Sequence, residues 1–152
     1  KVAKGTSIIG GGSTSYLNIG RGVQFTANSS SAQSFALLCY ASKPEYLCTD
    51  EVNPDKNAST AKTLQLPWDI QYKKYSAEGV EGTTLTLIFT RDDQTGSFTG
   101  YWYPGVIANR DKKSVVLAKS TPVTLYFESP DGRKATVDVN PATGTVTRTI
   151  DQ

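Results

Sequence analysis

The clearest pattern in the chain is the alternation of apolar and polar residues in its last third. Segments 123–127, 135–139 and 145–150 alternate in this way, and the Pro- and Gly-containing stretches 129–132 and 140–144 separate them. A period of two places one set of side chains on each face of a strand, and Pro and Gly favour tight turns. We therefore predict a three-strand antiparallel meander at the end of the chain.

Upstream segments also favour strands. Residues 68–72 alternate apolar with polar side chains, and segments 83–90, 96–103 and 114–118 are rich in β-branched and aromatic residues. The tryptophan and tyrosines at positions 68, 72 and 75 form a small aromatic set in this region. The expected fold class is α+β but β-dominated, with antiparallel sheets and at most one or two helices.

One helix is predicted over 31–42. Ser30 and Gln33 have the spacing of a capping box, and Pro44 follows the segment. The apolar run 35–40 fits a buried strand equally well, because short apolar runs do not distinguish the two states. Both interpretations stay open at this point.

Length and composition indicate one domain. The 152 residues are enough for a single core, and 19 Thr, 14 Ser, 13 Gly and 8 Tyr favour strands and turns. Residues 1–15 contain a Gly-Gly-Gly run and are predicted to be a flexible start, with residues 16–152 as the globular domain. The alternative is a short strand at 6–9 followed by a turn.

Charge and residue types exclude several functions. The formal net charge is only +2, so a nucleic-acid partner is not indicated. There is no His, which excludes His-dependent catalytic pairs and His metal ligands. We expect a non-enzymatic protein without a cofactor. A hydrolase that uses carboxylates alone is the last alternative, because no paired-acid motif is present.

Two small groups of residues are candidate sites. Cys39 and Cys48 are the only thiols, and their number and spacing predict one disulfide in an oxidising, extracytoplasmic compartment. Free buried thiols are the alternative. The spacing of Asn53, Asp55 and Asn57 is similar to the start of a calcium loop, although the Gly and distant Glu of an EF-hand are absent, so a plain solvated loop is the simpler interpretation.

Tyr101, Trp102 and Tyr103 form the densest aromatic cluster. On a strand, Trp102 faces one side while its two neighbours face the other. One face must belong to the core, and the other is a possible aromatic surface for a sugar or a protein. Packing of all three in the core is the alternative.

The arrangement resembles the globular heads of type IV pilins and type II secretion pseudopilins. The resemblance rests on 66–72 followed by 82–87, and on 127–133 followed by 139–146. It implies a structural subunit of a surface filament such as a pilus or fimbrium, with roles in adhesion, motility or secretion. Its partners would be other subunits or a surface partner, and its membrane contact would run only through a missing N-terminal segment. The alternative is a carbohydrate- or protein-binding β-sandwich module of an adhesin or secreted protein.

Overall fold

The computed structural model describes residues 4–8, 14–40, 46–48, 62–91, 96, 98–105, 115–117 and 119–151. Side chains are described for 21–35, 62–89, 96, 99–105 and 119–151. In this part of the chain the fold consists of two antiparallel sheets, and its one helical element is the 3₁₀ turn η1 (Pro67–Asp69). The prediction of a β-dominated antiparallel fold is confirmed.

The first sheet, sheet A, has eight strands. Its main path runs in the order β10-β4-β3-β2-β8-β9, with β1 beside β2 and β5 beside β3. The strands are β1 (Lys4–Ile8), β2 (Thr14–Phe25), β3 (Ser31–Tyr40), β4 (Tyr46–Cys48), β5 (Lys62–Gln65), β8 (Leu85–Arg91), β9 (Phe98–Tyr103) and β10 (Val115–Leu117).

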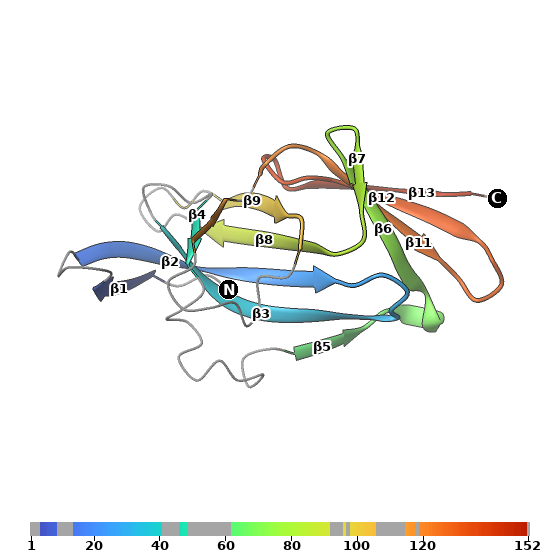
Figure 1. The fold of residues 1–152 in the computed structure, drawn as a ribbon, viewed down its shortest axis with the longest axis horizontal. Coiled ribbons are helices and arrows are strands. Elements are labelled where there is room, and N and C mark those ends of the chain that lie inside the picture. Colours follow the sequence, from blue (N-terminus) through green and yellow to red (C-terminus); the bar gives the residue numbers. More distant parts are fainter. Residues whose placement is uncertain are drawn as a thin grey trace.

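The second sheet, sheet B, has five strands in the order β13-β12-β11-β6-β7. They are β6 (Gln71–Ala77), β7 (Val80–Gly82), β11 (Val123–Glu128), β12 (Lys134–Asn140) and β13 (Thr145–Ile150). Sheet B lies towards the C-terminal end of the molecule, and β1 to β3 of sheet A extend away from it (Figure 1). The three segments predicted at the end of the chain are therefore part of a larger sheet, of which β13 is one edge.

The core lies between the two sheets. The inner face of sheet B contributes buried side chains from β6, β11 and β12, and β8 and β9 of sheet A supply the opposite wall. The buried members are Tyr72, Tyr75, Ala77, Leu85, Leu87, Trp102, Val123, Leu125 and Val139. Polar residues occupy the outer face of sheet B, where Thr124 donates a hydrogen bond to Asp138 (2.6 Å). This alternation explains why the last strands are the easiest to recognise in the sequence.

A β-bulge in β6 places two tyrosines on the same face. The register pairs Tyr126 with Lys74 and Phe127 with Tyr72, so Lys73 has no partner on β11. The extra residue changes the alternation, and Tyr72 and Tyr75 both enter the core although their spacing in sequence is odd.

The predicted helix over 31–42 is wrong, because Ser31–Tyr40 form strand β3. Gln33 does not reach back to Ser30; its amide instead donates a hydrogen bond to Thr63 on β5 (3.1 Å). The hydroxyl of Ser29 accepts the N–H of Ser31 (3.1 Å) in a local turn. β3 lies between β2 and the pair β4 and β5, so the apolar run belongs to an interior strand.

Two other expectations change in the structure. The range 1–15 contains β1, which pairs with β2, so the alternative of a short strand is closer to the structure than a wholly flexible start. Residues 68–72 are not one strand, because Trp68 and Asp69 belong to η1 and β6 begins at Gln71. In the described residues no helix is long and apolar enough to cross a membrane.

Candidate functional site

The aromatic cluster that the sequence singles out lies mainly in the core. Tyr101 and Trp102 are only 7% and 3% exposed, and Tyr103 is half-buried. β8 and β9 are buried on both faces at this point. Tyr101 and its register partner Ile88 are buried on one face, and Trp102 and its partner Leu87 are buried on the other. The predicted exposed platform is therefore wrong for Tyr101 and Trp102, and the alternative of core packing describes them.

The other predicted sites are not brought together by the described residues. Asn53, Asp55 and Asn57 lie outside them. Cys39 and Cys48 lie on adjacent strands, but the register pairs Cys39 with Leu47 and Cys48 with Leu38, so the cysteines are not directly opposite. Nothing in the described structure supports the disulfide, which stays a prediction.

The structure instead shows a groove of about 670 Å³ at the uncovered end of sheet B. We call it the Trp68 groove. It is lined by residues from three parts of the chain: the segment 66–70, the end of β11 with the turn that follows it (127–133), and Ala135, Val137, Arg148 and Ile150 from β12 and β13. Its volume lies within the range of small-molecule and cofactor pockets, roughly 300–1,000 Å³.

A cluster of aromatic rings supports the floor of the groove. Phe127, which lines the groove, packs with Phe25 and Tyr72 at centroid distances of 6.1 and 5.9 Å. The third pair, Phe25 and Tyr72, is 5.3 Å apart. These rings connect both sheets, so the floor is part of the core. The groove is therefore a preformed surface.

Trp68 stands at the mouth of the groove in an unusual backbone conformation. Its φ and ψ are 54° and 33°, and the next residue, Asp69, has a φ of 56°. The turn is closed by a hydrogen bond from the N–H of Ile70 to the carbonyl of Pro67 (3.1 Å). Positive φ is strained for a bulky residue, and Trp68 is 85% exposed, so burial does not compensate for the strain. Strain of this kind, at an exposed aromatic residue, is typical of a functional position.

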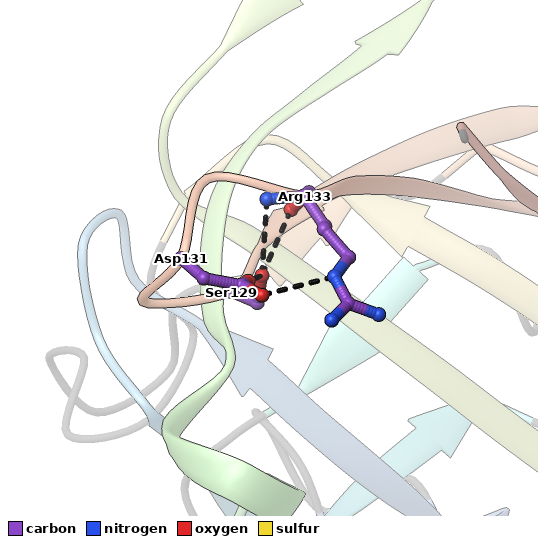
Figure 2. A network of polar contacts seen from close by, with 3 residues as sticks. All are labelled: Ser129, Asp131 and Arg133. Atoms are coloured by element: carbon purple, nitrogen blue, oxygen red, sulfur yellow. Dashed lines mark hydrogen bonds and ion pairs between the residues drawn. The ribbon is translucent and has the colours of Figure 1, made fainter.

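The turn between β11 and β12 forms a second wall of the groove and carries its own polar network. Ser129 donates a hydrogen bond to Asp131 and accepts the N–H of Arg133 (3.1 Å), and the Arg133 guanidinium binds Asp131 (2.9 Å) (Figure 2). The Ser129 hydrogen bond, with Arg133 beside it, lowers the pKa of Asp131. The charges of Asp131 and Arg133 therefore compensate each other within the turn.

The third wall is β13, all of whose residues are exposed. Its register pairs Val139 with Val146, Val137 with Arg148, and Ala135 with Ile150. Val146 and Ile150 lie on the inner face of sheet B, the face on which Val139 is buried, but they are 58% and 55% exposed. The apolar inner face of sheet B thus continues past the region that sheet A covers.

Arg148 brings charge into this apolar wall. Glu128 and Asp131 also line the groove, but neither lies within ion-pair distance of Arg148, and no other carboxylate among the described side chains does so. The same part of the chain contains no group of three potential metal ligands. The arrangement can bind an apolar ligand with an acidic group; it brings together no set of residues that we recognise as catalytic.

The groove thus brings together three residues that the sequence alone does not connect: Trp68, Arg148 and Ile150. The alternation of residues 68–72 predicts a strand at Trp68, although Pro67 before it is equally typical of a turn. Arg148 could be recognised as a candidate site residue from the sequence, because it is a charged residue at a position where the alternation of 145–150 predicts an apolar one.

Relief of the strain at Trp68 tests this description. We expect the double variant Trp68→Asn, Asp69→Gly to raise the free energy of unfolding by about 1–2 kcal/mol, because Asn-Gly suits a turn with two positive φ angles. Urea denaturation followed by circular dichroism measures it. A loss of stability would show that the Trp68 side chain contributes more to the fold than its exposure indicates.

Comparison of the chain with protein-family models, with curated proteins and with solved structures found no significant match.

Proposed function

We propose that this protein is a non-enzymatic, extracytoplasmic binding module that recognises a segment of another protein in the Trp68 groove. The observation that carries the proposal is Trp68, which is 85% exposed and strained at the mouth of an apolar groove. The Thr- and Ser-rich composition favours an extracytoplasmic location. Pilin-like assembly does not explain why the fold maintains this conformation.

The residue types at the groove support a protein partner. Trp and Arg are the residues that most often dominate the binding energy of protein interfaces, and Trp68 and Arg148 lie on the same groove. The floor is apolar and charged side chains lie around it, which is the usual anatomy of a protein interface. A sugar is the less favoured ligand, because the aromatic surface predicted for it is largely buried.

Filament assembly, the function that the pilin resemblance implies, stays a second proposal. The observation that favours it is the exposure of β13 along its whole length at the edge of sheet B. A neighbouring subunit could cover such an edge. Assembly that depends on protein concentration, seen by light scattering or electron microscopy, would support it.

A library of short linear peptides displayed on phage tests the first proposal. We expect the wild-type protein to enrich peptides with alternating apolar residues, and we expect Trp68→Ser to lose that enrichment because the exposed indole is the main anchor. Val80→Ser is the matched control, since Val80 is also exposed (63%) but lies at the other edge of sheet B.

The same three proteins are screened on a glycan array. Enrichment of peptides that needs Trp68 but not Val80 supports the proposal. Glycan binding that needs Trp68, without peptide enrichment, would contradict it in favour of a sugar-binding module. Absence of both kinds of binding would also contradict it.

A further inference from the structure

Backbone groups at the edge of sheet B beside the groove have no strand paired with them in the part of the chain that the structure describes. β13 pairs only with β12 among the described residues. The N–H of Asp151 donates to the carbonyl of Lys134 (2.9 Å), which makes 134 and 151 a hydrogen-bonded pair of the antiparallel ladder. Such pairs alternate with non-bonded pairs. Thr149 and Thr147 therefore bond towards β12.

The remaining residues of the strand face the open edge. Val146, Arg148 and Ile150 belong to the non-bonded pairs, so their N–H and C=O groups point away from β12. Their side chains also lie on the inner face of sheet B, where Arg148 and Ile150 line the Trp68 groove and Val146 lies further along the strand. The same three residues thus offer main-chain hydrogen bonds at the edge and side-chain contacts on the groove side.

The charge on β13 indicates which kind of segment can pair with it. Arg148 is the only charged residue of β13 and has no carboxylate partner among the described side chains, whereas Asp131 is already bonded to Arg133. A second copy of β13 paired antiparallel, with the same face inward, would bring two Arg148 side chains close together. Like charges across a strand pair are destabilising, which favours a different chain with an acidic residue.

We propose that an extended segment of a partner protein adds to sheet B beside β13. Its backbone bonds with Val146, Arg148 and Ile150, and an acidic side chain faces Arg148. Apolar side chains two positions before and after the acidic residue pack beside Val146 and Ile150 on the inner face of sheet B. This binding mode is strand addition, in which main-chain bonds give affinity and alternate side chains give specificity. The inference rests on the proposed function, because it specifies how the groove recognises its partner.

The test uses a blocked peptide of sequence Thr-Val-Thr-Glu-Thr-Val-Thr and a second peptide in which Lys replaces Glu. Amide hydrogen exchange is measured by NMR on the whole chain, with and without each peptide. We expect the Glu peptide to slow exchange at Val146, Arg148 and Ile150 by at least about tenfold. The amides of Thr147 and Thr149, which already bond to β12, are the internal control and should change little.

Charge reversal tests the role of Arg148. We expect wild-type protein to bind the Glu peptide roughly tenfold more tightly than the Lys peptide, and Arg148→Glu to reverse that preference. Thr149→Glu is the matched control, because it adds a charge to an adjacent position on the outer face, opposite the uncharged Thr136. It should leave the preference for the Glu peptide in place.

The outcomes separate the inference from the proposed function. Peptide binding without protection of Val146, Arg148 and Ile150 would overturn strand addition and leave the groove as a binding site. Failure of both peptides to bind would overturn the inference, and the phage library then decides the proposed function independently. Protection at the open edge, together with the reversed preference of Arg148→Glu, supports the inference.

Discussion

Replacement of Trp102 with alanine is expected to lower the free energy of unfolding by about 3–5 kcal/mol, as removal of a large buried aromatic side chain usually does. Trp102 is 3% exposed and packs on Tyr75 at a centroid distance of 5.8 Å. Its indole donates a hydrogen bond to Thr121 (3.2 Å), and its backbone pairs with Lys119. The variant loses packing between the two sheets and also leaves the Thr121 hydroxyl without this donor.

Trp68→Ala is the matched control, because the same side chain is removed from an exposed position. It should change the free energy of unfolding by less than about 0.5 kcal/mol, or raise it slightly. Guanidinium denaturation followed by circular dichroism measures both variants. Equal losses for the two would contradict the burial that assigns Trp102 to the core and Trp68 to the groove.

Tyr72→Phe is expected to stabilise the protein by about 1 kcal/mol at neutral pH. The Tyr72 side chain is fully buried, and its hydroxyl finds no hydrogen-bond partner among the described residues. A buried hydroxyl without a partner has lost its bonds to water and gained none in return. Phenylalanine keeps the ring contacts with Phe25 and Phe127 and removes the unsatisfied group.

The same tyrosine gives the stability a dependence on alkaline pH. Burial, with a smaller contribution from Tyr75, raises the pKa of Tyr72 well above its ordinary value of 10.0. Above pH 10 the Tyr72 phenol ionises in the unfolded chain but stays neutral in the folded protein. The contribution of this group to the free energy of unfolding is therefore complete below pH 10 and is lost as the pH rises. The loss is at most about 1.4 kcal/mol for each pH unit above 10.

Urea unfolding of wild type and Tyr72→Phe at a series of pH values from 7 to 11 measures both effects. We expect the variant to be more stable throughout and to lose less stability above pH 10. Tyr75→Phe is a useful comparison, because burial raises the pKa of Tyr75 as well. Parallel curves for wild type and Tyr72→Phe would show that the Tyr72 hydroxyl ionises as freely in the folded protein as in the unfolded chain.

The sequence predicts best those strands that have one buried and one polar face. The segments at 123–127, 135–139 and 145–150 become strands whose ends differ by no more than one residue from those expected. Each has alternating side chains and a turn with Gly at positive φ, Gly132 or Gly144. Local pattern and turn chemistry agree there, and the burial of Val123 and Leu125 follows from the same alternation.

Interior and glycine-containing strands were harder to predict. Gly20 and Gly22 interrupt the β2 pattern, although Gly22 is buried between β3 and β8, where it pairs with Phe35 and Ile88. β3 has a continuous apolar run, which local periodicity cannot distinguish from a helix. In both strands the conformation is decided by neighbours distant in sequence.

The candidate site was less predictable than the fold. The cluster of aromatic residues in the sequence suggests an exposed binding surface at Tyr101 and Trp102, but both side chains are buried. Their burial depends on which strands cover the two faces of β9, and a single sequence does not show this. The Trp68 groove depends on where sheet A ends relative to sheet B. Arg148 becomes informative only when its strand is known to be an edge.

The central claim is that the Trp68 groove binds a segment of another protein, and the indole N–H signals of the protein test it most directly. The chain has two tryptophans, so an ¹⁵N-labelled sample gives one indole signal for Trp68 and one for Trp102. A peptide enriched from the phage library is titrated into it. The account predicts that the Trp68 signal shifts until saturation while the buried Trp102 signal stays in place. A bound peptide that leaves the Trp68 signal unchanged would contradict it.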